Sequence, residues 1–383
     1  MTTAGRIPFV RAEGQPFDVG YAHGAARARA LHDFLDDGVG RLNHVMPAPV
    51  SLESLRPTLA AFDAEITAGA PHLAEEIGGL ARGADISREQ ALLLQLRREI
   101  MGYQRIPTRG DCTTYARSGA EPVLAQTIDL NGDLDDQLTV LHVAPAGSAR
   151  RTLVLSFAGL LGYLGLNSDG LAIGLNLVLG GRWRPGLPPY LAIRRLLDEA
   201  ASVDDALAML PGLRLASSRS LTLCDATKAV WVEILGDEVR AVAARESTHT
   251  NHFLHPDFAP YDEINIFARN SSRQRLDACR AGLAALPPDA GVEEHFALLS
   301  APPICVADTG DIRRERTVAA VVLLPGRGEL HVRPGDPSRA RTQSFQLNGE
   351  LESSAGGERS RRETQVPAGG AELGAGQKGR IRD

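Results

Sequence analysis

The hydrophobic pattern of this 383-residue chain changes its period near residue 113. Before that point, apolar and small residues recur at helical spacing over 16–37, 55–68, 74–81 and 87–103. After it, short runs alternate with a period of two, and Gly, Asn and Asp turns separate them. This change predicts a chain that combines a helical first hundred residues with a β-rich remainder.

The second part of the chain contains many short strands and only a few helices. Predicted helices lie at 189–209, 271–286 and 292–299, and residues 167–170 predict a hairpin turn. The predicted strands are 123–128, 138–143, 152–157, 171–178, 220–224, 229–235, 239–244, 317–324 and 329–332. Because helices flank the strand runs on both sides, we expect an α+β domain of two stacked sheets between helical layers, an αββα sandwich.

The end of the chain has a different composition. Residues 337–383 are rich in Gly, Ser, Glu, Arg and Gln, have almost no aromatic residues and show no helical or strand period. A segment of this kind buries too little apolar surface to offset its conformational entropy. We therefore expect a disordered tail after residue 336.

Charge and composition narrow the classes of partner and cofactor. The formal net charge of −6 gives no cationic field for nucleic acid or an anionic membrane. The only lysines, Lys228 and Lys378, stand in no phosphate-loop or Schiff-base context, so no cofactor is expected. The four cysteines lie far apart, Met1 to Arg6 lack a signal-peptide pattern, and no long apolar segment is present. We expect a cytoplasmic protein with no nucleic-acid or membrane partner.

Cys112 is the first candidate catalytic residue. It lies between a long arginine-rich helical segment and the first strand-like run, and Thr113 and Thr114 follow it. A cysteine released as a new N-terminus by self-cleavage would use its own α-amino group as the base, since that group has a reference pKa of about 7.7–8.0. The alternative is a half-buried structural cysteine.

Several separated motifs extend this hypothesis. They are Gly14, Gly20, His23 and Gly24; 112–114; 126–129; 159–163; 165–172; Asn176; 249–254; 314–322; and 332–337. In this order and spacing, the chain resembles the acyl-coenzyme A:6-aminopenicillanate acyltransferase family of penicillin biosynthesis over residues 14–337. That family is a branch of the self-processing N-terminal nucleophile (Ntn) hydrolases that use cysteine.

The resemblance implies self-cleavage between Asp111 and Cys112. The products would be a helical α chain of residues 1–111 and a catalytic β chain that starts at Cys112 and includes the 112–336 part of the αββα domain. Thr113 and Thr114 belong to the same autoprocessing stretch. This chain departs from the family in having Asp111 at the scissile bond, where glycine is usual, and a carboxylate there could either assist or hinder the acyl shift.

The resemblance also implies roles for four more residues. Asp129 matches the aspartate that orients the α-amino group of the nucleophile and contacts substrate, and Arg314 matches an arginine of the substrate pocket. Asn251 matches the asparagine that donates to the oxyanion, a task that suits an uncharged amide. Tyr163 belongs to an apolar segment near the expected pocket, although this segment could equally be core. For Asp129, the alternative is a turn aspartate.

Two other clusters suggest different chemistry. His249, His252 and His255 stand three residues apart, which raises the alternative of a zinc hydrolase, but side chains at that spacing in an extended segment point to different faces. Asp133, Asp135 and Asp136 with Asn131 resemble a cation loop that lacks the terminal glutamate of a calcium site. We expect a solvated loop near the pocket rim, and no metal.

These observations predict an autoproteolytic cysteine amidohydrolase that forms an acyl-enzyme on Cys112 from a small amide or peptide-like conjugate. An acyltransferase that moves an acyl group from an amide or thioester to an amine is the alternative, and the resemblance then implies acyl-coenzyme A as a donor. An alternative of another class is an uncleaved small-molecule-binding protein with the same fold, which Asp111 at the cleavage position favours.

Overall fold

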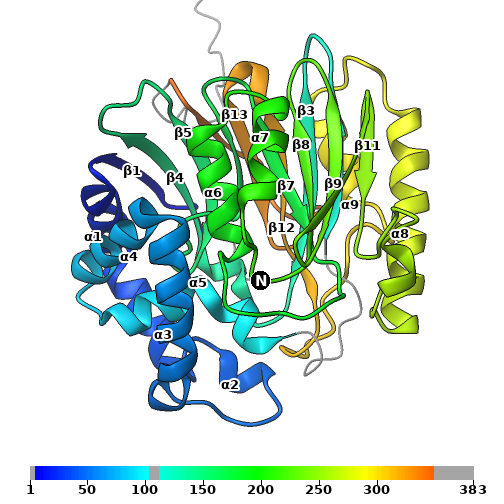
Figure 1. The fold of residues 1–383 in the computed structure, drawn as a ribbon. Helices are drawn as coiled ribbons and strands as arrows, with labels where there is room; N and C mark the ends of the chain where they lie inside the picture. The colour runs from blue at the N-terminus through cyan, green and yellow to red at the C-terminus, as the bar shows by residue number, and fades with distance from the viewer. Residues whose placement is uncertain (1–4, 103–111, 349–383) are drawn as a thin grey trace, which may run out of the picture. The chain divides into compact units, whose positions relative to one another are not determined.

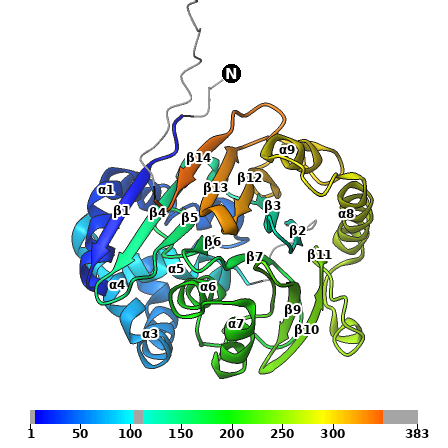
Figure 2. The same ribbon diagram turned by 90° about the horizontal axis from the view of Figure 1, so that it is seen from above.

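A computed structural model describes residues 5–102 and 112–348 of the chain. Within them, two β-sheets pack face to face, and helices cover the outer face of each sheet (Figures 1 and 2). The predicted α+β class and αββα layering are therefore confirmed.

The larger sheet has eight strands in the order β1-β4-β5-β6-β7-β8-β9-β10. Neighbouring strands are antiparallel except for the parallel pair β1 and β4. The bounds are β1 Phe9–Gly14, β4 Leu138–Pro145, β5 Thr152–Phe157, β6 Leu164–Asn167, β7 Ala172–Asn176, β8 Arg219–Cys224, β9 Ala229–Leu235 and β10 Glu238–Ala244. The predicted turn at residues 167–170 joins β6 to β7, as expected.

The smaller sheet has six strands in the order β11-β2-β3-β12-β13-β14, and all its neighbours are antiparallel. Strands β2 and β3 pack on β7 and β8 of the larger sheet. The bounds are β2 Thr113–Arg117, β3 Val123–Leu130, β11 Glu246–His249, β12 Arg316–Leu324, β13 Glu329–Pro334 and β14 Gln343–Gln346. The strand that follows Cys112 is therefore an inner strand of the smaller sheet, packed against the larger one.

The helices divide between the two outer faces (Figure 2). Helices α1 and α6 pack on the larger sheet, whereas α8 and α9 pack on the smaller one. Among the described residues, no helix is long and apolar enough to cross a membrane. The bounds are α1 Pro16–Asp36, α2 Leu42–Val45, α3 Leu52–Gly69, α4 Pro71–Ala84, α5 Arg88–Met101, α6 Pro189–Glu199, α7 Val203–Met209, α8 Ile266–Ala285 and α9 Val292–Ser300.

The side chain of Gln126 joins the two sheets at their centre. From β3, its Nε2 donates to the carbonyl oxygen of Leu175 on β7 (2.8 Å), and its Oε1 accepts from the amide nitrogen of Leu175 (3.0 Å). Gly174 makes room for this contact, because a Cβ there would lie 2.6 Å from Oε1 of Gln126. The side-chain amide of Gln126 thus satisfies the backbone N–H and C=O of Leu175, as a neighbouring strand would. It also fixes the position of β3 relative to β7.

Glycines let α1 and α4 touch along their backbones. A Cβ on Gly20 would lie 1.9 Å from the carbonyl oxygen of Glu76, and one on Gly79 would lie 2.0 Å from that of Phe17. No larger residue fits either position without moving a helix. This contact gives a packing reason for Gly20, one of the first-helix glycines in the family resemblance.

Three of the strands that were not predicted lie at sheet edges. β1 and β11 are short runs in which the charged residues Arg11, Glu13 and Glu246 take exposed positions of the alternation. β14 lies inside the expected tail, so order extends beyond residue 336: Phe345 is buried and stacks on Phe9, with ring centroids 5.5 Å apart. β14 also pairs with β13 from Gln343 to Gln346, and the composition of the segment does not reveal this edge strand. Residues 349–383 lie outside the described residues.

Candidate active site

Cys112 directly precedes β2, and its side chain is buried. Its carbonyl oxygen accepts two hydrogen bonds, from Nδ2 of Asn176 on β7 (2.9 Å) and from Nη1 of Arg275 on α8 (2.8 Å). Its Sγ lies 3.7 Å from the hydroxyl oxygen of Tyr163. Groups from the larger sheet and from an outer helix therefore fix the backbone at Cys112 and orient its thiol.

Arg275 joins Cys112 to Asn251. Besides its bond to the Cys112 carbonyl, Nη1 of Arg275 donates to Oγ1 of Thr113 (2.9 Å), and Nη2 donates to Oδ1 of Asn251 (2.7 Å). The arginine is fully buried. Because the guanidinium is planar and rigid, it holds the two residues in one fixed frame although they lie far apart in the sequence.

Asn251 follows β11, and both its backbone and its side chain are held. Its backbone nitrogen donates to Oγ of Ser272 on α8 (2.8 Å), and its Nδ2 donates to the carbonyl oxygen of Leu177 (3.0 Å). Since Arg275 occupies Oδ1, the amide orientation is determined, and within residues 5–102 and 112–348 the second N–H of Nδ2 has no acceptor. An asparagine fixed in this way is suited to donate to an oxyanion.

A buried pair of side chains, His249 and Glu233, supports the segment before Asn251. Nε2 of His249 lies 2.8 Å from Oε1 of Glu233, and Nδ1 lies 2.7 Å from the carbonyl oxygen of Thr250. Glu233 also accepts from the backbone nitrogens of Leu254 and His255 (2.5 and 3.0 Å). Both ring nitrogens of His249 lie within hydrogen-bond distance of oxygen atoms, so the imidazole links Glu233 to Thr250 and clamps the turn that carries Asn251.

Asp129 lies near the end of β3 and is buried. Its Oδ1 accepts a hydrogen bond from Oγ1 of Thr317 on β12 (2.7 Å), the residue opposite it in the sheet. Asp129 is therefore a strand residue in the smaller sheet, on the strand next to β2. The turn alternative considered for this aspartate does not hold, because the strand continues to Leu130.

The other residues of the expected autoprocessing stretch are partly described. The backbone nitrogen of Thr113 donates to Oγ1 of Thr127 (3.2 Å). Thr114 is fully buried, and its Oγ1 has no hydrogen-bond partner among the described residues. Asp111 lies outside the described residues. Both threonines belong to β2, which extends the smaller sheet from Cys112.

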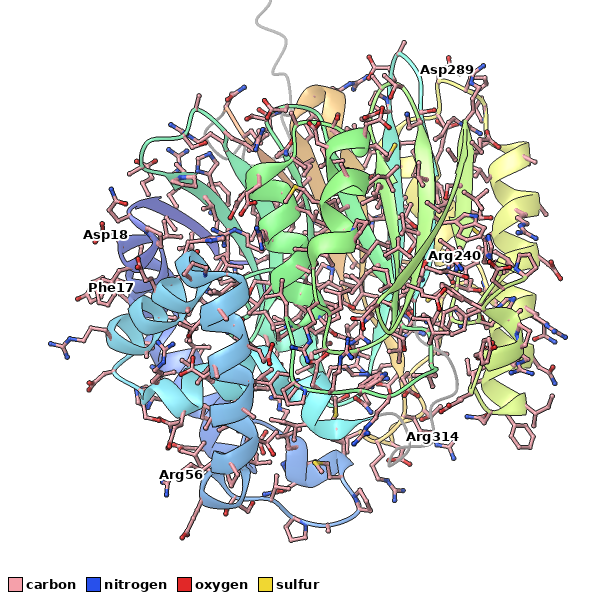
Figure 3. All side chains as sticks on the ribbon, viewed as in Figure 1. Phe17, Asp18, Arg56, Arg240, Asp289 and Arg314 are labelled. Carbon is pink, nitrogen blue, oxygen red and sulfur yellow. The ribbon has the colours of Figure 1, made fainter. Side chains whose placement is uncertain are left out.

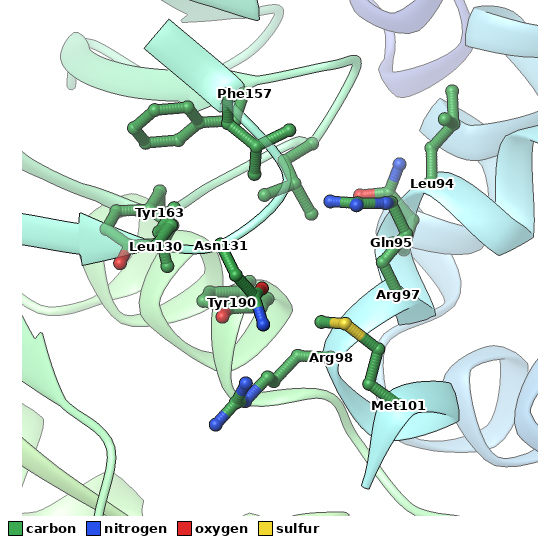
Figure 4. A pocket seen from close by; sticks show the side chains of 12 residues that line it. Leu94, Gln95, Arg97, Arg98, Met101, Leu130, Asn131, Phe157, Tyr163 and Tyr190 are labelled. Atoms are coloured by element: carbon green, nitrogen blue, oxygen red, sulfur yellow. The ribbon is translucent and has the colours of Figure 1, made fainter. Parts of the chain in front are cut away.

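Two adjoining hollows lie beside Cys112. The first, the Cys112 hollow, is lined by Cys112, Leu175, Leu177 and Arg219; the second, the α5 hollow, is lined by Leu94, Met101 and Phe157, among others (Figure 4). Both are lined by Arg98, Leu130, Tyr163 and Tyr190. The rings of Tyr163 and Tyr190 stack with their centroids 5.2 Å apart, and they form the common wall.

The charged residues that line the two hollows, within the described part of the chain, are all arginines: Arg97, Arg98 and Arg219. Arg219 lies over the rings of Trp183 and Tyr190, and its Nη2 lies 3.4 Å from Oε1 of Glu99. Burial raises the pKa of Glu99, and the charge of Arg219 opposes that shift. The site therefore offers positive charge and aromatic surface to whatever binds there.

Arg314 is not brought to either hollow. Its side chain is 40% exposed and lies 3.5 Å from Asp311, at the lower edge of the view in Figure 3. Arg316, two residues later, is mostly buried and pairs with Asp133 (3.0 Å) and Asp135 (2.6 Å). A substrate contact by Arg314 stays a prediction, and its present neighbours do not favour it.

The acidic loop is neutralised by arginines. Arg316 holds two of its carboxylates, and Arg41 holds Asp136 at 2.7 Å. Asn131, which precedes the loop, is instead buried and lines the α5 hollow. The side chains of Asp133, Asp135 and Asp136 are 34–53% exposed, so the segment is a solvated loop beside the α5 hollow, as we predicted, and its arginine partners tie it to the rest of the fold.

The three spaced histidines have different partners. His249 pairs with Glu233, His252 Nδ1 lies 2.7 Å from Oγ of Ser272, and His255 Nδ1 accepts from the backbone nitrogen of Asp257 (3.2 Å). Burial, with His249 nearby, lowers the pKa of His252 to about 4. In residues 5–102 and 112–348, no group of three His, Cys, Asp or Glu side chains is arranged to hold a metal ion.

The remaining cysteines lie away from the hollows and are free thiols. Burial raises the pKa of Cys279 to about 12 and that of Cys305 to about 11, and it raises the pKa of Cys224 further. These thiols are therefore protonated and unreactive near neutral pH.

Sequence reasoning missed Arg275. A signal was present, because Arg275 falls on the buried stripe of α8 formed by Ala268, Ser272, Leu276 and Cys279. An arginine on the apolar face of a helix needs buried acceptors, and the helical spacing of this stripe is visible in the sequence itself. That combination marks Arg275 as a candidate site residue.

The fold and the matches to known proteins define the family to which this chain belongs. A four-layer sandwich of two mainly antiparallel sheets is the architecture of the Ntn hydrolases. Residues 116–339 match the model of the acyl-coenzyme A:6-aminopenicillanic acid acyl-transferase family, a range that starts four residues after Cys112 and includes Asp129, Asn251 and Arg275. The chain belongs to this family, so it is an enzyme of a family named for acyl transfer.

Individual relatives are distant. The chain is 26% identical over 298 residues to the acyl-coenzyme A:6-aminopenicillanic-acid-acyltransferase 40 kDa form of Emericella nidulans, a match that covers 76% of this chain and 80% of that protein. Similar solved structures include penicillin V acylase from Agrobacterium tumefaciens (15% identity, 62% and 86% of the two chains, TM-score 0.45). Another is a mutant of conjugated bile acid hydrolase from Clostridium perfringens (10% identity, 62% and 93%, TM-score 0.45).

Proposed function

We propose that this protein is a self-processing cysteine amidohydrolase that forms an acyl-enzyme on Cys112. The observation that carries the proposal is the guanidinium of Arg275, which holds the Cys112 carbonyl and the Asn251 amide together beside the two hollows. A nucleophile and a fixed oxyanion donor in one buried frame are what acyl transfer requires.

Maturation is the first step of the proposed mechanism. The Cys112 thiolate attacks the carbonyl carbon of Asp111, the peptide nitrogen leaves with a proton, and a thioester forms. Water then hydrolyses the thioester, which gives residues 1–111 a terminal carboxylate and Cys112 a free α-amine. Without this step the α-amine is an amide and cannot act as a base.

Catalysis uses the new α-amine. It takes the thiol proton, and the thiolate adds to the substrate carbonyl, whose oxygen becomes an oxyanion that receives the second N–H of Asn251 Nδ2. The ammonium group then returns its proton to the leaving amine, and a thioester remains on Cys112. The α-amine next takes a proton from water, and the hydroxide adds to the thioester carbonyl. The C–S bond then breaks, the carboxylic acid is released, and the ammonium group returns its proton to the Cys112 thiolate. In this scheme, the Asp129 carboxylate and the hydroxyl of Thr317 position the α-amine.

A second candidate function is transfer of the acyl group to an amine. The family name favours it, and an acyl-coenzyme A thioester would then also serve as donor. The chemistry up to the thioester is the same, and only the acceptor differs. Comparing the yield of acid with that of new amide in the presence of a primary amine separates the two activities.

Intact-mass spectrometry tests the proposal. The wild type is expected to give two species of roughly 12 and 29 kDa by residue share, with Cys112 at the N-terminus of the larger one. Cys112→Ala is expected to stay as one chain and to lack amidase activity. Cys305→Ala, a matched variant at a thiol outside the hollows, is expected to be processed and active.

One full-length mass for the wild type would favour the uncleaved binding protein. Processing of Cys112→Ala would remove the nucleophile from the mechanism. An uncleaved wild type that still turns over an amide with a Cys112-dependent burst would retain the acyl-enzyme and contradict only the α-amine as base.

A further inference from the structure

The hydroxyl oxygen of Tyr163 lies 3.7 Å from Sγ of Cys112, a distance at which oxygen and sulfur can share a hydrogen bond. Tyr163 directly precedes β6 of the larger sheet, whereas Cys112 directly precedes β2 of the smaller one. Both side chains are buried, and both line the Cys112 hollow. The fold thus brings a phenol from one sheet to the sulfur of the proposed nucleophile on the other.

Packing on two sides fixes the ring of Tyr163. The ring stacks on Tyr190 of α6, with centroids 5.2 Å apart, and makes a T-shaped contact with Phe157 of β5 at 5.0 Å (Figure 4). Gly162 allows the close approach to α6, since a Cβ there would lie 2.8 Å from the carbonyl oxygen of Tyr190. A phenol oxygen lies in the plane of its ring, so these contacts also set the position of the hydroxyl group relative to Sγ.

The surroundings of the sulfur give this hydroxyl group a task. Leu130, Leu175 and Leu177 line the Cys112 hollow beside it. Apolar surroundings disfavour a thiolate, because the charged sulfur loses the solvation that water provides. A hydrogen bond to the charged form offsets that cost.

The direction of the hydrogen bond depends on the charge of the sulfur. In the neutral state either atom can donate. A phenol is a weaker acid than a thiol, with reference pKa values of about 10 and about 8.5, so Tyr163 keeps its proton when the α-amine removes that of Cys112. The hydroxyl group then donates to the thiolate. A charge-assisted bond of this kind is roughly twice as strong as a neutral one, so it favours the thiolate over the thiol.

We propose that Tyr163 is a catalytic residue that donates a hydrogen bond to the Cys112 thiolate. The thiolate forms twice in the reaction, before the sulfur attacks the substrate carbonyl and again when the C–S bond of the thioester breaks. Tyr163 keeps its proton in both steps, since the α-amine carries the proton each time. The inference rests on the proposed function of Cys112, but the state of the thiol can be measured without any substrate.

The test is the pH dependence of Cys112 alkylation by iodoacetamide, which reacts with the thiolate. Mass spectrometry of the modified peptides distinguishes Cys112 from the other three cysteines. Tyr163→Phe keeps the ring and its two aromatic contacts but removes the hydroxyl group. The midpoint of the alkylation profile should therefore rise by about one pH unit or more, since a hydrogen bond to a charged group changes an equilibrium constant by about tenfold or more. Well above the midpoint, the variant should react at least as fast as the wild type.

Two further variants assign the shift to the hydroxyl group. Tyr163→Leu also loses the ring, and it should raise the midpoint by the same amount as Tyr163→Phe. Tyr190→Phe is the matched control, because it removes a hydroxyl group from the adjoining ring of the same wall, and that group makes no hydrogen bond to Cys112. It should leave the midpoint unchanged.

Three results would overturn the donor role. The first is a midpoint that is unchanged or lower in Tyr163→Phe. The second is a shift in Tyr163→Leu alone, which would assign the effect to ring packing. The third is a rate that falls equally at every pH in Tyr163→Phe, which would indicate a structural effect on access to the sulfur.

The outcomes also separate this inference from the proposed function. A midpoint that rises in Tyr163→Phe, in a protein that stays as one chain and cleaves no amide, would support the donor and contradict the amidohydrolase. Amide cleavage that requires Cys112, with a midpoint that Tyr163→Phe does not change, would overturn the donor and leave the amidohydrolase standing.

Discussion

The guanidinium of Arg275 lies 2.7 Å from Oδ1 of Asn251, and the same group lies 2.8 Å from the carbonyl oxygen of Cys112. The arginine comes from α8, whereas the two residues that it joins flank β2 and β11. The proposed nucleophile and the proposed oxyanion donor thus depend on a third residue that contacts both and is too enclosed to reach solvent.

Arg275→Met should lower kcat far more than it raises KM. Without the guanidinium, Asn251 can rotate, and the oxyanion loses a fixed donor, so we expect a loss of about 100-fold in kcat. Arg275→Lys should recover part of the rate, because an ammonium group can still reach one acceptor. Steady-state kinetics with an amide substrate that the wild type cleaves measures both effects.

Arg273→Met provides the control for this prediction. Arg273 is exposed on the same helix, so its replacement should change neither constant. If Arg275→Met raises KM with kcat unchanged, Arg275 contributes to substrate binding and does not position Asn251.

Glu233→Gln should destabilise the turn before Asn251. The amide nitrogen that it introduces would face either His249 or a backbone N–H, so at least one buried donor would lose its acceptor. Breaking a buried pair of this kind costs about 3–5 kcal/mol. Urea titration measures the loss. Glu238→Gln is the control, because Glu238 pairs with Arg240 on the surface of β10, and it should change the free energy of unfolding by less than about 1 kcal/mol. Equal effects of the two substitutions would contradict a structural role for the His249 pair.

Most of the fold follows from local patterns, but the site does not. The strands 152–157 and 229–235 were predicted at their observed bounds, because their short runs of apolar residues and their flanking turns are local signals. Cys112 and Asn251 were joined in one site only through the family resemblance, since their approach depends on pairing between β2 and β11 and on α8. The polarity of the α5 hollow was also missed, because Arg97 looks like a surface residue at a helix end.

Acidification should destabilise the protein through buried histidines. His23 is fully buried, neither of its ring nitrogens is hydrogen-bonded to a described residue, and burial, with Arg27 and Arg194 nearby, lowers its pKa to about 3. In the unfolded chain the pKa is about 6.5. Between these two values the unfolded state binds a proton that the native state does not, so stability falls as the pH falls below about 6.5, by about 1.4 kcal/mol per pH unit.

Urea unfolding at three pH values between neutral and about 5 tests this linkage. His23→Leu should reduce the slope by up to about 1.4 kcal/mol per pH unit, because only the unfolded-state proton of that residue is lost. His252 and His295, whose pKa values burial lowers to about 4, should maintain the remaining slope. A slope that is unchanged in His23→Leu would mean that His23 is protonated in the native state.

Two consecutive glycines of α4 should respond in opposite directions to alanine. A Cβ on Gly79 would lie 2.0 Å from the carbonyl oxygen of Phe17 on α1, whereas one on Gly78 would meet only Nη1 of Arg88 at 3.3 Å. Gly79→Ala must therefore separate the two helices and should cost about 1–3 kcal/mol or more. Gly78→Ala places alanine in a helix interior with space beside a flexible side chain, so it should stabilise the protein by up to about 1 kcal/mol. Thermal unfolding of the two variants measures the difference, and a similar loss in both would mean that helix contact is not what requires glycine at position 79.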